Sequence, residues 1–448
     1  YGTGRAKIID ADGVGLYAHN TAGLVISQLI FEGYGADYNK ADGILFYNDL
    51  PGNVKLAFVR IQNVETAKFG RYGVAIGGAN VASGFRDVRI SNLWTHDNGD
   101  GGLLTYGKRK NVNQNVYVGY SRAFANDGHA LSTLPSSGNG IVLGSVDGGT
   151  IERCLAYGNG TTGKIPNGVW AYDSNNIVIQ YNESYGNRSV RPVDGGGFAL
   201  DRNVTNSVMQ YNYSHDNEGV GYLLTHPVND DNHAGNRVRF NVSQNDARDN
   251  RGAIRIYGRV IDTEIHNNTI YLGAVPAGKP KPAAVFFNNA RVPSAYPERL
   301  HIRNNIFRTD RGMPVVFAAA SVLRGARDLR FEGNSYYSGG ATWQVNWGGT
   351  NYFSLAAWRT GTGQEKLGTQ SVGSDVDPKL TNGGGGGTIA NPTSLSSGLP
   401  AYRLQATSPL VNMGLNLPAL FSVDPGPRDF YGNTLPQSGA YDVGAHDR

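Results

Sequence analysis

The stretch IVIQYNESYGN at residues 177–187 recurs about 30 residues later as VMQYNYSHDNEG at residues 208–219. In both copies a short alternating strand ends at an asparagine, Asn182 or Asn212, and a second short strand follows. Related copies are VRISNLWTHDNG from Val88, TIERCLAYGNG from Thr150, VRFNVSQND from Val238, EIHNNTIY from Glu264 and HIRNNIF from His301. A motif that repeats at this period predicts a solenoid in which each repeat forms one coil.

A second motif accompanies the first and consists of a glycine followed by an alternating apolar strand. Its copies are GILFYN from Gly43, GVAIGG from Gly73, GLLTYG from Gly102, GIVLGS from Gly140, GVWAYD from Gly168, GFALDR from Gly197, GYLLTH from Gly221 and AIRIYG from Ala253. Each coil therefore has three strands. Because side chains alternate between the two faces of a strand, Ile44, Val74, Leu103, Ile141 and Val169 are predicted to point inward, and the residues between them outward. The sequence predicts an all-β chain, a parallel β-helix of about ten or more coils.

Five successive asparagines, Asn182, Asn212, Asn241, Asn268 and Asn305, occupy one turn position of the repeat. Stacked amides in such a column can bond to each other and to the backbone. This looks like the asparagine ladder of the pectate-lyase-like superfamily, and the chain resembles its secreted bacterial, carbohydrate-active members. The resemblance implies a single-stranded right-handed parallel β-helix that binds a polysaccharide on the strand after the long loops.

The repeat weakens beyond about residue 340, which predicts two parts. Residues 1–340 are expected to form the parallel β-helix, and residues 341–448 the irregular final coils and a C-terminal cap packed on the same solenoid. The ending AYDVGAHD from Ala440 resembles the closing segments of secreted bacterial β-helix proteins, which implies an extracellular location. The chain begins in strand-like sequence, so we expect a leader or first coil before Tyr1.

The composition limits the kinds of molecule that the chain is expected to bind. The chain has 40 basic and 36 acidic residues, a net charge of +4 without a polybasic run, which argues against nucleic-acid binding. No apolar run approaches the length of a membrane span, and the single cysteine, Cys154, excludes an internal disulfide. We expect a monomer whose partner is a polysaccharide substrate.

The outward positions of the glycine-led strands are the predicted binding face. Exposed aromatic rings beside polar groups suit sugars, whose C–H faces stack on rings while their hydroxyls need fixed partners. The alternative is that the rings only cover an exposed sheet. The residues predicted to bind substrate are Trp170, Tyr172, Tyr106, Tyr257, Asp230 and Asp231.

The same region contains the candidate catalytic residues, Asp201, Arg255, Asp194, Asp173 and His226. A glycoside hydrolase needs two carboxylates, one of them protonated. A lyase needs a group that neutralises the uronate and a base, for which Arg255 is the candidate. The alternative is that Asp173 and Asp194 cap turns.

A possible Ca²⁺ site follows from resemblance. The block VDGGGFALD from Val193 is similar to the D-x-D-G-F-x-L stretch that carries calcium ligands in one pectate lyase family, which implies Asp194 and Asp201 as metal ligands. Glycines replace the neighbouring acidic residues, and no lysine stands at the family's base position. The metal-like runs HDNGDGG from His96 and SHDNEG from Ser214 fall at one turn of their coils, where turn chemistry explains them.

These observations predict an extracellular polysaccharide-degrading enzyme. Arg255 and the basic balance favour a polysaccharide lyase that cleaves an acidic, uronate-containing polymer by β-elimination. The first alternative is a glycoside hydrolase with paired aspartates in the same groove, although the paired-aspartate, Gly-His-Gly and Arg-Ile-Lys motifs of the polygalacturonase group are absent. The second alternative is a non-catalytic polysaccharide-binding or adhesion protein.

Overall fold

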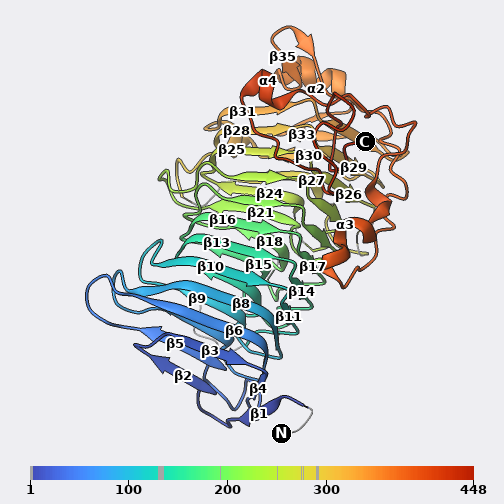
Figure 1. Cartoon of the computed structure of the whole chain (residues 1–448). Helices are drawn as coiled ribbons and strands as arrows, with labels where there is room; N and C mark the ends of the chain where they lie inside the picture. The colour runs from blue at the N-terminus through green and yellow to red at the C-terminus, as the bar shows by residue number, and fades with distance from the viewer. Residues whose placement is uncertain are drawn as a thin grey trace. The chain divides into compact units, whose positions relative to one another are not determined.

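A computed structural model of the chain describes residues 4–129, 136–191, 193–249, 251–273, 275, 277–288 and 292–448. Short β-strands dominate these residues, and none of the four α-helices described is longer than eight residues. Figure 1 shows the whole chain, with its strands drawn as arrows. The chain divides into two compact units. Unit 1 comprises residues 1–207 and 217–219, and unit 2 comprises residues 208–216 and 220–448.

Unit 1 is built of strands that are mostly three to seven residues long. They are β1 (Ala6–Ile9), β2 (Leu16–His19), β3 (Leu24–Ser27), β4 (Leu29–Glu32), β5 (Ile44–Asn48), β6 (Lys55–Ala67), β7 (Tyr72–Gly78), β8 (Gly84–His96), β9 (Gly101–Tyr106), β10 (Asn113–Gly119), β11 (Arg122–Phe124), β12 (Asn139–Gly144), β13 (Val146–Glu152), β14 (Leu155–Tyr157), β15 (Asn167–Tyr172), β16 (Asn175–Gln180), β17 (Glu183–Tyr185) and β18 (Gly196–Leu200).

The glycine-led strands of unit 1 form one sheet. Strands β2, β5, β7, β9, β12, β15 and β18 pair in parallel in that order. Their inward residues stack in register, and Ile44, Val74, Leu103, Ile141 and Val169 are 0–1% exposed. The predicted inward column is therefore confirmed, because period-two alternation leaves these apolar side chains no other favourable face.

The remaining strands of unit 1 form the other walls of the coil. Strand β10 pairs in parallel with β8 and β13, and β11 pairs with β8 and β14, so that β10, β11 and β12 make one coil of three strands. A column of buried asparagines follows the turn beside β11, β14 and β17. Each side-chain Nδ2 donates to the next Oδ1 over 2.8–3.0 Å, through Asn98, Asn126, Asn159, Asn187 and Asn217. The sequence predicts turns at Asn98 and Asn217, and the structure adds that these turns hold an amide column.

Unit 2 contains the other strands and all the helices described. They are β19 (Val208–Gln210), β20 (Tyr213–His215), β21 (Tyr222–His226), β22 (Arg237–Arg239), β23 (Val242–Gln244), β24 (Gly252–Gly258), β25 (Ile261–His266), β26 (Thr269–Leu272), β27 (Ala283–Asn288), β28 (Glu298–Arg303), β29 (Ile306–Thr309), β30 (Val316–Ala318), α1 (Ala320–Leu323), β31 (Arg327–Glu332), β32 (Ser335–Ser338), β33 (Val345–Trp347), β34 (Thr350–Tyr352), α2 (Leu355–Thr362), β35 (Lys366–Leu367), β36 (Gln370–Ser371), η1 (Pro392–Ser394), α3 (Leu395–Gly398), η2 (Pro400–Tyr402) and α4 (Leu417–Phe421).

The same architecture continues in unit 2, where β21, β24, β27, β30 and β33 pair in parallel in that order. Seven such strands in unit 1 and five in unit 2 agree with the predicted ten or more coils. The predicted all-β parallel β-helix is confirmed.

The predicted asparagine ladder lies in unit 2 and ends at a carboxylate. Each Nδ2 donates to the next acceptor over 2.8–3.0 Å, through Asn212, Asn241, Asn268, Asn305, Asn334 and Glu365. Glu365 also accepts from the Tyr336 hydroxyl at 2.6 Å, and its burial raises its pKa to about 7. The first predicted member, Asn182, lies in unit 1 and accepts the backbone N–H of Cys154 at 2.8 Å.

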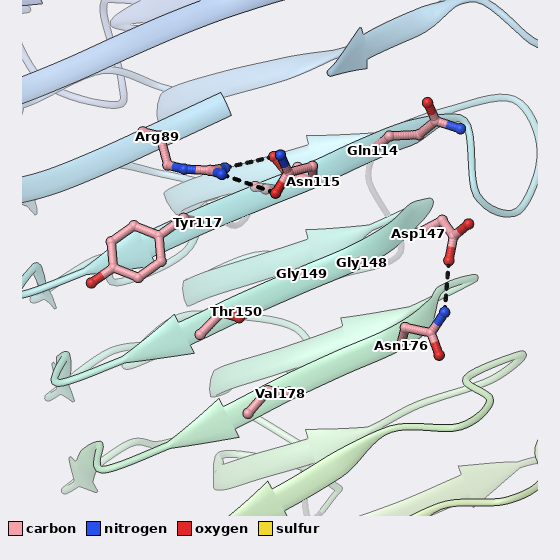
Figure 2. A pocket seen from close by; sticks show the side chains of 11 residues that line it. Arg89, Gln114, Asn115, Tyr117, Asp147, Gly148, Gly149, Thr150, Asn176 and Val178 are labelled. Carbon is pink, nitrogen blue, oxygen red and sulfur yellow. Dashed lines mark hydrogen bonds between the residues drawn. The ribbon is translucent and has the colours of Figure 1, made fainter. Parts of the chain in front are cut away.

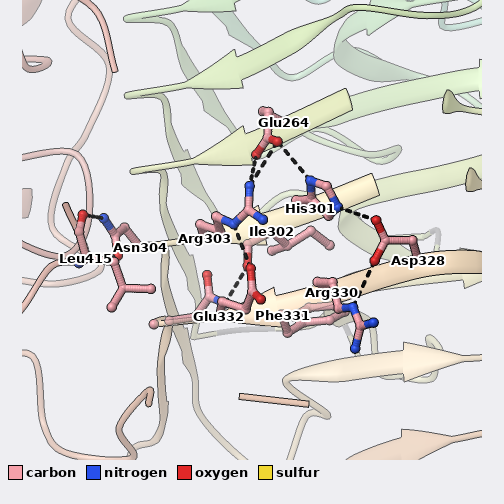
Figure 3. Close-up of polar contacts among 12 residues, drawn as sticks. Glu264, His301, Ile302, Arg303, Asn304, Asp328, Arg330, Phe331, Glu332 and Leu415 are labelled. Carbon is pink, nitrogen blue, oxygen red and sulfur yellow. Dashed lines mark hydrogen bonds and ion pairs between the residues drawn. The ribbon is translucent and has the colours of Figure 1, made fainter. Parts of the chain in front are cut away.

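Figure 3 shows an ionic network on the outer side of β25, β28 and β31 in unit 2. Arg303 bonds to Glu264 at 2.8 Å and to Glu332 at 2.7 Å. His301 bonds to Glu264 at 2.9 Å through Nδ1 and to Asp328 at 3.0 Å through Nε2. The network links charged side chains of three successive coils.

The C-terminal segment packs against the coils of unit 2. Asn304 exchanges two hydrogen bonds of 2.9 Å with the backbone of Leu415, and the guanidinium of Arg303 lies 3.8 Å from the centre of the Phe421 ring. The boundary near residue 340 stays a prediction. Among the residues described, no helix has both the length and the apolar character that a membrane crossing requires.

Candidate active site

Tyrosine and glycine alternate on the outer side of the glycine-led strands of unit 1. Tyr47 pairs with Gly77, Gly77 with Tyr106, and Gly144 with Tyr172. A Cβ atom on Gly144 would lie 2.3 Å from Cζ of Tyr172, and one on Gly77 would lie 2.6 Å from the Tyr106 ring. Each of these two rings therefore lies across the glycine of the preceding pairing position, which only a residue without a side chain permits.

Two cavities open along this face. The first, of about 460 Å³, has the lining residues Asp42, Leu45, Tyr47, Arg71, Tyr72, Ala75, Gly78, Ala79, Leu104, Tyr106, Gly107, Lys108 and Tyr172. The second, of about 340 Å³, has the lining residues Tyr72, Leu104, Ser136, Ile165, Trp170, Tyr172, Asp201 and Arg202. Because Tyr72, Leu104 and Tyr172 line both, we treat the two cavities as one surface, the strand-face cleft.

Trp170 is held in this cleft by a buried asparagine. Its indole Nε1–H donates to Oδ1 of Asn139 at 3.0 Å, and its ring centre lies 5.3 Å from that of Tyr172 at an angle of 35°. The sequence predicts that Trp170 points outward and is exposed. The direction is correct, but the exposure is wrong, because the side chain is only 8% exposed between the sheet and the surrounding cleft walls.

Asp201 follows the end of β18 and lies in the same cavity as Trp170. Burial raises its pKa to about 6, against the opposing effects of the backbone N–H of Arg202, which donates to Oδ1 at 2.6 Å, and of the Arg202 charge. Asp173 is close to this group, since its carboxylate lies 3.9 Å from Nη2 of Arg202 and accepts from Nδ2 of Asn203 at 2.5 Å. A carboxyl group with a pKa near 6 can exchange a proton with a bound molecule near neutral pH.

The first cavity contains further charged groups at its end nearest β5. Asp42 is 2% exposed, accepts the backbone N–H of Tyr72 at 3.0 Å and lies 3.5 Å from Nη1 of Arg71. Burial raises the pKa of Asp42, and the Arg71 charge partly opposes this. Asp100 is also buried and lies 4.0 Å from Nε of Arg71. Arg71 thus stands between two buried carboxylates at the cleft wall.

The sequence reasoning missed Asp42, Arg71, Tyr72, Asp100, Lys108 and Arg202. It examined the outward positions after each leading glycine and not the residues before it. Asp42 directly precedes Gly43, and Asp100 directly precedes Gly101 and Gly102. An aspartate just before the glycine-led strand was the feature that could have identified both.

Other predicted residues lie outside this cleft. Asp194 is half-buried in a left-handed conformation (φ 60°) two residues before β18, and it is not among the lining residues. Residues 130–135 and 192, in the long segments before β12 and β18, lie outside the described residues.

Five predicted residues belong to unit 2. Arg255 is 6% exposed, donates from Nε to Asn288 at 3.1 Å and lies 5.1 Å from the centre of the Tyr257 ring. Arg255 is therefore mostly enclosed by its neighbours, and its role as the base of a lyase stays a prediction. His226 is fully buried and bonds through Nε2 to Asp230 at 2.9 Å.

Asp230 and Asp231 line a separate cavity of about 650 Å³ in unit 2. Asp231 pairs with Arg259 at 2.6 Å. The catalytic and binding roles of the residues in unit 2 stay predictions.

The described residues contain no cluster of His, Cys, Asp and Glu side chains of the kind that holds a metal ion. Calcium takes six to eight oxygen ligands, and among the described residues no group of three or more His, Cys, Asp or Glu side chains is placed to hold a metal ion. Asp201 lies in the cleft and Asp194 does not line it. The Ca²⁺ ligand pair implied by the pectate lyase resemblance stays a prediction.

Comparisons with known proteins agree with the fold. Residues 52–270 match the family described as the right-handed β-helix region. The chain is 26% identical over 239 residues to a lacto-N-biosidase of Bifidobacterium longum subsp. longum, a match that covers 48% of this chain and 13% of that protein's length.

Solved structures with a similar chain path include two carbohydrate-active proteins. A periplasmic alginate epimerase mutant is 13% identical with a TM-score of 0.43, covering 76% of this chain and 69% of that one. A pectate lyase is 14% identical with a TM-score of 0.38, covering 99% of this chain and 86% of that one.

The parallel strand pairing, the stacked inward columns and the match over residues 52–270 have one common explanation. The chain has the fold of a right-handed parallel β-helix, and residues 52–270 match the family described by that name.

Proposed function

We propose that the chain is a carbohydrate-active enzyme that cleaves a polysaccharide in the strand-face cleft of unit 1. The observation that carries the proposal is the carboxyl of Asp201, whose pKa of about 6 is raised by burial in the same cavity as the Trp170 ring. Cleavage of a glycosidic bond needs a surface that holds the sugar and a group that donates a proton. An aromatic ring and a neighbouring carboxyl group can supply both. The partial similarity to a lacto-N-biosidase supports a carbohydrate substrate.

Glycoside hydrolysis is the reaction that this arrangement supports best. Asp201 would protonate the oxygen of the leaving sugar. Asp173, which lies beside Arg202 but is not among the lining residues of the cleft, would activate water or attack the sugar directly. Arg202 lies next to both carboxylates, with its backbone N–H on Asp201 and its guanidinium 3.9 Å from Asp173. It would keep Asp173 in position while Asp201 transfers the proton.

A polysaccharide lyase is the second candidate. The observation in its favour is the set of basic side chains that line the cleft. Arg71, Lys108 and Arg202 line the cleft and would attract the carboxylate groups of a uronate polymer. Arg255, the predicted base, is engaged by Asn288 and Tyr257 in unit 2, so a lyase would need another base in the cleft. Among the lining residues, Tyr172 is a candidate for proton exchange with the sugar, although burial raises its pKa to about 12.

The experiment is a screen of neutral and uronate polysaccharides with the wild-type chain and the Asp201→Asn variant. Reducing ends and ultraviolet absorbance are both recorded, with and without a chelator. Hydrolysis gives new reducing ends without absorbance, whereas β-elimination also gives the absorbance of an unsaturated uronate. We expect Asp201→Asn to slow cleavage by about 100- to 10,000-fold.

The other outcomes decide the remaining proposals. Cleavage that Asp201→Asn leaves intact would contradict the assigned site. Loss of activity in the chelator arm would support the calcium that the sequence predicts. If no polysaccharide is cleaved but one is bound, the chain is a binding or adhesion protein. Extracellular location and a monomeric state remain part of the proposal, the second of which light scattering can test.

A further inference from the structure

A column of left-handed residues runs along the outer side of β8, β10, β13 and β16 in unit 1. Asp87, Asn115, Gly148 and Asn176 have φ values of 52°, 51°, 74° and 55° and occupy equivalent places, because their neighbours on both sides pair in register. Aspartate and asparagine tolerate this conformation and glycine adopts it freely. Only the β13 member of these four has no side chain.

The two members of the column nearest the N-terminus, Asp87 and Asn115, each accept hydrogen bonds from an arginine. Arg60 donates to the backbone carbonyl and the carboxylate of Asp87 at 2.7 and 2.9 Å. Arg89 donates to the carbonyl and to Oδ1 of Asn115 at 2.9 and 3.0 Å. The forked hydrogen bonds fix the orientation of the Arg89 guanidinium.

This pattern stops at the next coil. Tyr117 pairs with Arg89 and stands where an arginine would be expected, but its hydroxyl donates to Glu152 at 3.0 Å. The ring leans across Gly119, where a Cβ atom would lie 2.2 Å from the Tyr117 oxygen. With the ring turned toward Glu152 and no side chain on Gly148, a hollow of about 430 Å³ opens, which we call the Gly148 hollow.

Figure 2 shows the side chains around the Gly148 hollow. Arg89, Asn115 and Tyr117 lie on one side, and Asp147 and Asn176 on the other. Asp147 is held in place, since its Oδ1 accepts from Nδ2 of Asn175 at 2.8 Å and of Asn176 at 3.2 Å. The hollow therefore has fixed donors, a fixed acceptor and one aromatic ring around an open floor of glycine and threonine.

Such a lining matches the chemistry of a sugar. Hydroxyl groups both donate and accept, so they can use the Arg89 guanidinium, the asparagine amides and the Asp147 carboxylate together. The C–H face of the sugar ring can lie against Tyr117. The volume of the hollow is within the range of small-molecule sites. Its charged side chains are one cation, Arg89, and one anion, Asp147, so the lining favours neither a polyanion nor a polycation.

We propose that the Gly148 hollow is a second glycan-binding site, on a different sheet from the strand-face cleft. It would hold one or two sugar units of a polysaccharide while the cleft acts on another part of the chain. The identity of its ligand rests on the proposed function, whereas its position rests only on the geometry of β10, β13 and β16. Two weak sites on one polymer bind it more tightly than either alone, because the second contact is intramolecular.

The test fills the hollow without disturbing the fold. Gly148→Asn places in the column the residue that Asn115 and Asn176 already carry at similar φ, and a Cβ there would have only the backbone nitrogen of Asn115 within 4 Å, at 3.9 Å. Gly158→Asn is the matched control. Gly158 is also left-handed (φ 61°), belongs to unit 1, has no atom within 4 Å of a Cβ, and does not line the hollow. Tyr117→Ala removes the stacking ring as a second variant.

Binding is measured by retardation of the full chain in gels containing a neutral xylan or a polyuronate, and cleavage is measured on a short hexasaccharide. We expect Gly148→Asn and Tyr117→Ala to weaken retardation by about tenfold on one of the polymers, and Gly158→Asn to behave as the wild type. Hexasaccharide cleavage should be unchanged in Gly148→Asn.

The two proposals fail separately in this design. If Asp201→Asn abolishes cleavage but Gly148→Asn and Tyr117→Ala leave retardation unchanged, the second site is wrong and the function stands. If nothing is cleaved but Gly148→Asn still weakens retardation, the function is wrong and the site stands. Absence of retardation of the wild type in both polymers would overturn the second site.

Discussion

The indole of Trp170 and the amide of Asn139 are joined by a hydrogen bond of 3.0 Å. Asn139 is fully buried, and the same Oδ1 accepts the backbone N–H of Asn167 at 3.3 Å, while Nδ2 donates to Ser136 at 3.0 Å. The orientation of the cleft's tryptophan is thus determined by a residue on the neighbouring strand, β12, which does not itself line the cavity.

Asn139→Ala should therefore weaken substrate binding more than it slows the reaction. Without its partner the Trp170 ring can rotate, so we expect KM to rise several-fold with a smaller change in kcat. The buried groups left without partners should also lower the free energy of unfolding by about 1 to 3 kcal/mol. Trp170→Phe keeps a ring but removes the donor, and a KM equal to that of the wild type in both variants would contradict this role.

The pKa of Asp201 predicts a dependence of stability on pH. Its folded value of about 6 lies above the ordinary 3.8, so the folded state binds the proton more tightly than the unfolded state does. The free energy of unfolding should decrease as pH rises from about 4 to 6, by about 1 to 2 kcal/mol, and stay low above that range.

Asp201→Asn imitates the protonated form and should remove this decrease. Urea denaturation at pH 4 and pH 8 gives the comparison, with the variant more stable than the wild type only at the higher pH. Equal differences at both pH values would mean that the carboxyl is not buried as described. If Asp201 is the acid, cleavage should also decline as pH rises through about 6.

Gly144→Ala should move the Tyr172 ring. A Cβ atom at this position lies 2.3 Å from Cζ of Tyr172, which is too close for both to remain. Because the conflict is with the far end of a side chain, the ring should rotate away while the strand stays in place, and KM should rise several-fold. A double-mutant cycle with Tyr172→Ala checks this, since Gly144→Ala should add no further effect once the ring is gone.

His301 should make unit 2 sensitive to pH. Burial lowers its pKa, but the hydrogen bonds to Glu264 and Asp328 outweigh this effect, and the net pKa is raised above 6.5. A raised histidine pKa gives stability that is fully present below about pH 6.5 and is lost as pH rises through the folded value. The loss of stability should be less than about 1 kcal/mol, because the group is near the surface. We expect it to be absent in His301→Gln. Unfolding curves of wild type and variant between pH 5 and 9 that run parallel would contradict it.

The repeat and the alternation of apolar residues in the sequence were sufficient to predict the fold and the face of the strand on which each side chain lies. Ile44 and Val169 are buried because period-two alternation and stacking in register leave no choice of face. The exposure of Trp170 and Arg255 could not be predicted in this way, since it depends on distant residues such as Asn139 and Asn288.

The carboxylates of Asp42 and Asp100 illustrate a second limit. Their burial beside Arg71 depends on three neighbouring coils, and a single copy of the repeat shows only an aspartate before a glycine. Asp201, in contrast, was predicted because its position on an outward-facing strand can be read from one repeat.

The ladder from Asn212 to Glu365 has a further consequence, because every amide in it points the same way. Each Nδ2 faces the next coil toward the C-terminus and each Oδ1 faces back, so the small amide dipoles add along the axis of unit 2. Their positive end meets Glu365, which has only acceptor sites when ionised. The column is thus a side-chain analogue of the helix macrodipole, with a carboxylate placed at its positive pole.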